Sequence, residues 1–158
     1  MATTKLGKVV KRMDHVIDYA KDKSKTKPIE FNNKYEIIVD DLRNVIEYAR
    51  NSNKTEKEFF VTGINCEPDS AYEEMVDTKK YYNKEDKILA FHAYQSFEEG
   101  EVTPELAHRI GVQLANEMWG DRFQVIVTTH LNTNHIHNHF VLNSVSYVDG
   151  KKYYSNRV

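Results

Sequence analysis

Four of the seven histidines of this 158-residue chain lie within ten positions, in the segment HLNTNHIHNHFVLN at residues 130–143. His135, His137 and His139 alternate, and side chains at alternate positions of a β-strand point to the same face of a sheet. His130 ends the preceding apolar run, RFQVIVTTH, so a hairpin would bring it alongside the other three. The spacing therefore predicts a cluster of up to four imidazoles on one face of a sheet.

Such a cluster indicates a divalent metal site, because neutral imidazole is a common metal ligand whereas protonated imidazoles repel one another. We assign the ligands to His130, His137 and His139 and treat His135 as an outer neighbour or alternate ligand. Three protein ligands leave coordination positions for substrate oxygens, an arrangement typical of catalytic sites. We expect the ion to be Mg²⁺ or Mn²⁺.

Other polar residues are predicted less strongly to belong to the metal site. Asn132 and Asn143 are candidates to orient the imidazoles by hydrogen bonds from outside the ligand shell. His92, in AFHAY, is expected to stand apart from the cluster, although a position on the same face stays open. His108 belongs to a predicted long helix, where exposure to solvent is the default expectation.

Two tyrosines, Tyr19 and Tyr48, occupy near-copies of one segment, VIDYAKDKSKT and VIEYARNSNKT. Each lies roughly 100° from the centre of the apolar stripe of its predicted helix, which is not the position of a simple core residue. A tyrosine oxygen can attack a phosphodiester and keep the phosphate as a covalent ester, while a metal ion neutralises the non-bridging oxygens. Lys25 and Lys54, which follow the two tyrosines, are candidates to bind phosphate.

Periodicity predicts the elements that position these residues. Strands are expected at 3–10, 57–66, 87–97, 122–130 and 135–148, and helices at 12–26, 40–55, 67–82 and 103–121. The last helix has the clearest signals, since Thr103 can cap it, Pro104 suits its first turn and Gly120 can end it. Its expected buried stripe is Leu106, Ile110, Leu114 and Met118. This order predicts an α+β fold with a central, largely antiparallel β-sheet flanked by α-helices.

Bulk properties narrow the class of protein. With 40% hydrophobic and 29% charged residues the composition is that of a globular domain, and we treat 1–158 as one domain. No apolar stretch is long enough for a membrane span, and the start lacks the apolar core of a signal peptide. A single cysteine, Cys66, excludes an internal disulfide and suits the cytoplasm. Lys and Arg are concentrated in residues 1–27, an arm suited to contact a polyanion.

Three segments together resemble a known family: TTHLNTNHIHNHFVLNSVSYVDGKKYY, VIDYAKDKSKT and FFVTGINC. They are similar to the relaxase, or mobilisation nuclease, domains of conjugative plasmids and integrative conjugative elements, within the HUH endonuclease superfamily. The likeness is strongest to relaxases of Gram-positive gut bacteria and runs over nearly the whole chain. It implies a metal ion on two adjacent central strands and strand-specific nicking at an origin of transfer through a 5′-phosphotyrosyl link.

The resemblance also carries over residue by residue. The histidine pattern of the family falls on His130, His137 and His139, and its downstream asparagine falls on Asn143. YQSF, with Ser96, resembles the second motif of the family, which helps to hold DNA near the nick.

This sequence departs from the family at two places. Many members carry aspartate where Asn132 stands, and the helix expected after DGKKY is missing, so we expect the chain to be the N-terminal part of a longer protein. The family usually carries its nucleophile on the first helix after the first strand, which favours Tyr19, but the second copy leaves Tyr48 open.

The expected partners are single-stranded origin-of-transfer DNA and accessory mobilisation proteins. Three other functions stay open on the sequence: a rolling-circle replication initiator, a metal-dependent phosphodiesterase that uses activated water, and a non-enzymatic DNA-binding module.

Overall fold

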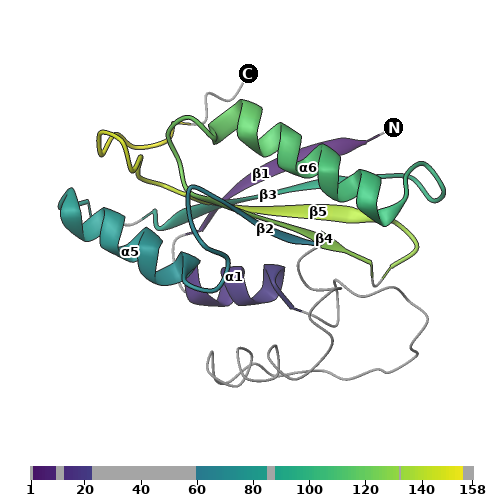
Figure 1. Ribbon diagram of the computed structural model, residues 1–158, viewed down its shortest axis with the longest axis horizontal. Coiled ribbons are helices and arrows are strands. Elements are labelled where there is room, and N and C mark those ends of the chain that lie inside the picture. Colours follow the sequence, from purple (N-terminus) through teal and green to yellow (C-terminus); the bar gives the residue numbers. More distant parts are fainter. Residues whose placement is uncertain (1, 10–12, 23–59, 85–87, 132, 155–158) are drawn as a thin grey trace.

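The computed structural model describes residues 2–9, 13–22, 60–84, 88–131 and 133–154 (Figure 1). The predicted helix at 40–55 and four candidate site residues, Lys25, Tyr48, Lys54 and Asn132, lie outside the described residues.

The described residues form one antiparallel sheet. Its strands are β1 (Thr3–Val9), β2 (Val61–Ile64), β3 (Ala90–Ser96), β4 (Val125–His130) and β5 (His137–Asn143). They lie in the order β1-β3-β5-β4-β2, so β5 is central and β1 and β2 are the edges. The predicted α+β fold with a central antiparallel sheet is confirmed.

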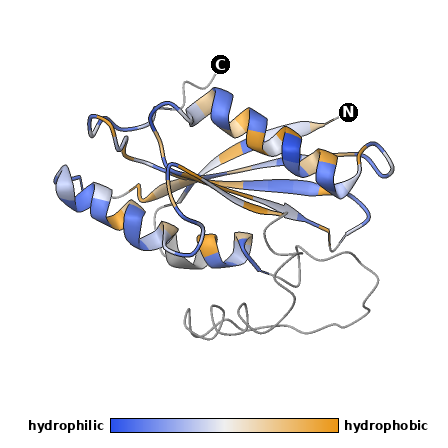
Figure 2. Cartoon of the chain, in the orientation of Figure 1, coloured by the Kyte–Doolittle hydropathy of each residue, from blue (hydrophilic) through white to orange (hydrophobic). Residues whose placement is uncertain are grey.

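Helices cover both faces of the sheet (Figure 1). Helices α1 (Met13–Ala20) and α5 (Ala71–Tyr81) lie on one face, and α6 (Pro104–Trp119) lies on the other. Each helix carries both hydrophilic and hydrophobic residues along its length (Figure 2), the pattern of an amphipathic helix that buries one side against a sheet. Among the described helices, none combines the length and the apolar character that crossing a bilayer requires.

The two faces of the sheet bury separate apolar clusters. The cluster under α6 is built around Phe140, Leu142 and Trp119, and the cluster under α1 and α5 contains Ile17 and Met75. Alternation along β5 assigns Phe140 and Leu142 to the α6 face, and His137 and His139 to the face of α1 and α5. The predicted histidine strand is therefore present, with its histidines on the face that carries the first helix.

Helix α6 begins as predicted, because the Thr103 side chain accepts a hydrogen bond from the Leu106 amide and Pro104 is in the first turn. Its predicted buried stripe is wrong: Met118 is 56% exposed, and the buried residues are Ala107, His108, Gly111, Ala115 and Trp119. Small residues on this side let the helix lie close to the sheet. A Cβ added at Gly111 would come within 2.5 Å of the Asn138 amide nitrogen.

Candidate metal centre

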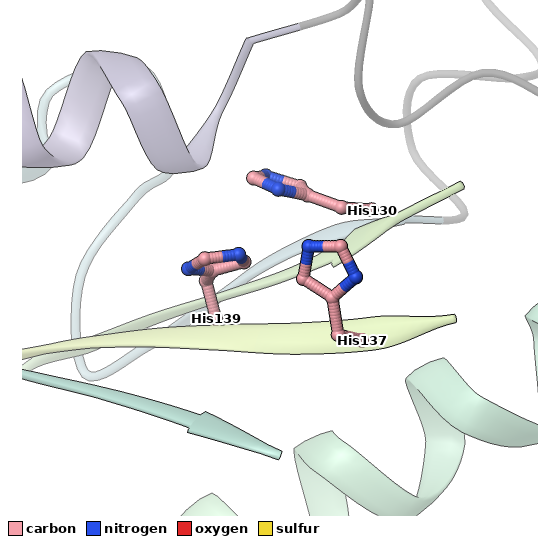
Figure 3. A group of neighbouring side chains, drawn as sticks. All are labelled: His130, His137 and His139. Carbon is pink, nitrogen blue, oxygen red and sulfur yellow. The ribbon is translucent and has the colours of Figure 1, made fainter. Parts of the chain in front are cut away.

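The β4–β5 hairpin brings the three predicted ligands together (Figure 3). His130 and His137 are direct partners in the strand register, and His139 pairs with Thr128 two positions further along. The ring centroids of His130 and His139 are 4.1 Å apart, and His137 lies 5.3 Å from the first and 5.0 Å from the second. Each residue offers one ring nitrogen, and the three nitrogens lie within 4.8 Å of one another.

Hydrogen bonds to the backbone fix the protonation of two of these rings. His130 Nε2 lies 2.7 Å from the carbonyl oxygen of Ala20, and His137 Nδ1 lies 3.0 Å from that of His135. A carbonyl oxygen can only accept, so both ring nitrogens must be N–H donors. In a neutral imidazole the lone pair is then on the other nitrogen, Nδ1 of His130 and Nε2 of His137. Metal-bound histidines are held in this way, and the three residues fit a divalent ion.

A fourth histidine lies in the cluster, and it is not the one that the sequence predicted. His92 on β3 places its Nε2 atom 2.8 Å from Nδ1 of His139, so the expectation that His92 stands apart is wrong. Burial lowers the pKa of His92, which favours its neutral form. β3 pairs with β5 in the sheet, and this pairing brings His92 to the cluster from a distant part of the sequence.

His135 lies outside the strand, because β5 begins at His137. It is exposed, and its ring Nδ1 is 3.3 Å from the carbonyl oxygen of Phe97. The prediction that His135 shares a strand face with His137 and His139 is therefore wrong. Its contact with His137 is made by the backbone carbonyl.

Tyr19 lies against the histidines from helix α1. Its ring centroid is 5.7 Å from that of His130 and 5.7 Å from that of His139, in edge-on contacts. Ile17 and Ala20 are buried and anchor α1 on the sheet, while Tyr19 is 48% exposed. The helix thus holds the tyrosine at the border between the histidine cluster and solvent.

Ser96 borders the cluster on the other side, since its backbone pairs with that of His137 in the β3–β5 register. Tyr94 and Lys5 lie next to it on the same face, with the Lys5 ammonium 5.9 Å from the centre of the Tyr94 ring. This strip joins a hydroxyl, an aromatic ring and a cation beside the histidines.

Asn143 lies at the opposite end of β5 and is fully buried. Its amide oxygen accepts a hydrogen bond from Lys79, and its amide nitrogen donates to Gln124 Oε1 at 2.9 Å. Burial lowers the pKa of Lys79 to about 8. These contacts tie α5 to the sheet and do not reach an imidazole.

His108 is buried on the opposite face of the sheet, so the expectation that it is exposed is wrong. Its Nε2 lies 2.8 Å from the Thr62 hydroxyl and its Nδ1 lies 2.8 Å from the Thr129 hydroxyl. Thr129 donates in turn to Asn138 Oδ1 at 2.7 Å, and the Asn138 amide nitrogen donates to Gln95 at 3.0 Å. Burial lowers the pKa of His108 to about 4.

Comparison with known proteins finds one family match and several similar relatives. Residues 48–158 match the family described as Relaxase: MobA/VirD2-like, nuclease domain. A Protein rlx of Staphylococcus aureus is 32% identical over 157 residues, which cover 99% of this chain and 38% of that protein. A second Protein rlx of the same species is 45% identical over 96 residues, 61% of this chain and 30% of that protein.

A group II intron-interrupted relaxase, LtrB, of Lactococcus lactis subsp. cremoris is 29% identical over 171 residues, 91% of this chain and 29% of that protein. The chain thus spans between 29% and 38% of the length of these relatives. No solved structure matches it. On the family match and the similarity to Protein rlx along 99% of the chain, this chain belongs to the MobA/VirD2-like relaxases, and residues 48–158 match their nuclease domain.

Proposed function

We propose that this chain nicks one strand of DNA at an origin of transfer, with Tyr19 as nucleophile beside a divalent metal ion held by His130, His137 and His139. The observation that carries the proposal is the position of Tyr19, whose ring lies 5.7 Å from two of the three histidines. Family membership supports nuclease chemistry, and the adjacent tyrosine favours covalent strand transfer over hydrolysis by water.

In the proposed reaction the phenolic oxygen of Tyr19 attacks the scissile phosphorus. A bond forms between phosphorus and the tyrosine oxygen, and the bond from phosphorus to the 3′ oxygen breaks, which leaves a 5′-phosphotyrosyl ester. The tyrosine gives up its proton to solvent, which reaches this half-exposed side chain, and the leaving 3′ oxygen takes one up. When bound, the divalent ion would neutralise charge on the non-bridging phosphate oxygens.

The substrate of this reaction is single-stranded or locally melted DNA. The histidines and Tyr19 come from a sheet face and a helix that covers it, and a stiff duplex cannot readily bring one phosphate to both. Ser96, Tyr94 and Lys5 continue from the cluster toward the edge strand β1 and suit a strand bound by hydrogen bonds, base stacking and phosphate attraction. Mobilisation or conjugative transfer, with accessory proteins, is the process that such a nick would serve.

Tyr48 is the alternative nucleophile. The family match begins at residue 48, which is this second tyrosine, whereas the similarity to Protein rlx over 99% of the chain includes both copies. Tyr19 has the support of its contacts with His130 and His139. The two tyrosines would otherwise be equivalent, because their local sequences are near-copies.

Phenylalanine variants test the proposal, since they keep the ring and remove only the attacking oxygen. Single-stranded DNA carrying the origin of the chain's own element would be incubated with Mn²⁺, and covalent adducts would be resolved on denaturing gels. We expect Tyr19→Phe to abolish the adduct and to leave DNA binding within a few fold, while Tyr48→Phe still forms it. An adduct lost only in Tyr48→Phe would reverse the assignment. Cleavage without an adduct in both variants would point instead to attack by water.

A further inference from the structure

The contact between His92 and His139 has the geometry of a hydrogen bond in the plane of both rings. The two nitrogens are 2.8 Å apart, the ring planes differ by only 21°, and the centroids are 5.0 Å apart. Two rings stacked face to face would bring their centroids closer and would not aim nitrogen at nitrogen. The rings therefore meet edge to edge, with one proton shared between Nδ1 of His139 and Nε2 of His92.

The identity of the donor decides whether His139 can bind a metal ion through Nε2. If Nδ1 of His139 donates, the lone pair of its neutral ring is on Nε2, and this nitrogen is a ligand. If His92 donates, the neutral His139 ring carries its proton on Nε2 and cannot bind a metal there. The direction of this one hydrogen bond thus sets the ligand state of His139.

For the other two proposed ligands, His130 and His137, the direction of the hydrogen bond is fixed. His130 and His137 donate to backbone carbonyl oxygens, those of Ala20 and His135, which accept and never donate. The Nδ1 atom of His139 instead meets the ring of His92, which can donate or accept, on a neighbouring strand. If the side chain at position 92 accepts a hydrogen bond from Nδ1 of His139, as the two carbonyl oxygens do from His130 and His137, all three rings present a lone pair to the ion.

We propose that His92 is a positioning residue for the metal centre, whose Nε2 accepts the Nδ1 proton of His139 and so presents Nε2 of His139 to the ion. This role rests on the proposed function of His139 as a ligand. Partners of this kind orient the ring and make the ligand nitrogen more basic, and their loss typically lowers metal affinity by about 10–100-fold. His92 itself is not a ligand in this scheme, because binding through Nε2 would break its bond to His139.

Two variants at position 92 separate this role from simple packing. His92→Leu removes the acceptor, while His92→Gln supplies an amide oxygen close to the position of the imidazole Nε2. Mn²⁺ affinity would be measured by calorimetry, with His108→Gln as a matched control that removes a buried imidazole from the other face of the sheet. We expect affinity to fall about 10–100-fold in His92→Leu, and to stay within a few fold of wild type in His92→Gln and His108→Gln.

A second measurement needs no metal ion. Long-range ¹⁵N–¹H NMR of the metal-free protein with ¹⁵N-labelled histidine reports which nitrogen of His139 carries the proton. We expect Nδ1–H in the wild type and in His92→Gln, and a shift toward Nε2–H in His92→Leu.

The possible results distinguish failure of the proposed role of His92 from failure of the metal centre itself. Wild-type Mn²⁺ affinity in His92→Leu, or a proton on Nε2 of His139 in the metal-free wild type, would overturn the role of His92 and leave the metal centre in place. Unchanged Mn²⁺ binding in His139→Ala would overturn the metal centre, and the role of His92 with it. If His92→Leu does not fold, the wild-type NMR measurement decides alone.

Discussion

The two faces of the sheet use the same residue type in opposite ways at the same end of the β4–β5 hairpin. On the α1 face, His130 and His137 form one cross-strand pair and His139 lies in the next but one. On the α6 face, the pair between them is Thr129 with Asn138, and it meets His108 from the helix. The first set brings ring nitrogens within 4.8 Å of one another, whereas His108 directs both of its nitrogens to hydroxyl groups.

The direction of the hydrogen bonds around His108 follows from the donor inventory. Thr129 donates its only hydroxyl proton to Asn138, so it must accept from Nδ1–H of His108, and Nε2 then accepts from Thr62. With the bond from Asn138 to Gln95, the chain of bonds joins α6 to strands β2, β4, β5 and β3. A slip of one residue in β4 or β5 would move the proposed metal ligands of that strand to the other face of the sheet, so this network protects the candidate site by fixing the register.

Burial alone does not reveal whether a histidine has a structural or a functional role. His108 and His139 are 7% and 6% exposed, yet one is satisfied within the protein and the other converges on two more imidazoles. What distinguishes them is the partner of each ring nitrogen.

Removal of a proposed ligand should affect metal binding most strongly while changing stability little. His137→Ala should lower Mn²⁺ affinity by more than the roughly 10–100-fold that loss of an outer partner costs. The metal-free protein should unfold within a few degrees of wild type, because His137 is only half-buried. Calorimetry and thermal unfolding measure the two quantities. His135→Ala is the control, since it keeps the backbone carbonyl that contacts His137 and should bind Mn²⁺ nearly as the wild type does. Equal losses in both variants would contradict the assignment.

For His108→Leu we expect a loss of stability with little change in metal affinity. This change leaves the hydroxyls of Thr62 and Thr129 without the imidazole, and each buried polar group that loses its partner costs about 1–3 kcal/mol. We expect the free energy of unfolding to fall by about 2–5 kcal/mol, while the folded protein keeps its Mn²⁺ affinity within a few fold. Urea unfolding followed by circular dichroism tests this. A loss below about 0.5 kcal/mol, the range of an ordinary surface change, would show that the network does not hold the sheet.

The same buried histidine predicts a dependence of stability on pH. Burial lowers the pKa of His108 to about 4, whereas a histidine in the unfolded chain titrates near 6.5. As the pH falls from about 6.5 to about 4, the unfolded chain binds a proton that the folded protein does not, so stability decreases across this range. The contribution is at most about 3 kcal/mol. His108→Gln cannot titrate, and metal-free unfolding curves should show a shallower pH slope for it than for wild type. Identical slopes would exclude His108 as the cause.

Much of the fold could be predicted because its signals are local. Thr103 and Pro104 begin a helix wherever it packs, and alternation along β5 sorts His137 and His139 from Phe140 without knowledge of the partner strand. The buried side of α6 could not be predicted in this way. Its large apolar residues suggested one stripe, but the close approach of helix and sheet at Gly111 required small residues on the buried side.

The same difference between local signals and long-range contacts decides which site residues could be predicted. A histidine triad on two strands of one hairpin is encoded in a short segment, and its spacing predicted it. His92 joins through the pairing of β3 with β5, which periodicity does not specify. One signal was available: Ser96 was already a candidate near the nick, and His92, four residues earlier on the same strand, must share its face. His108 had no comparable signal, because its partners come from two other strands.

The smallest predicted effect tests whether the α6-face network acts as a connected chain. Thr62→Val keeps the shape of the side chain and removes the hydroxyl that donates to His108 Nε2. Thr62 is half-buried on the edge strand β2, where water can partly replace it, so the loss should be only about 1 kcal/mol. In a His108→Leu background the hydroxyl has already lost this acceptor, and Thr62→Val should then be neutral or stabilising, since an apolar pair replaces a half-broken polar one. Urea unfolding of the wild type, both single variants and the double variant measures this coupling. Equal costs of Thr62→Val in both backgrounds would mean that Thr62 and His108 contribute independently, and the network would then end at His108.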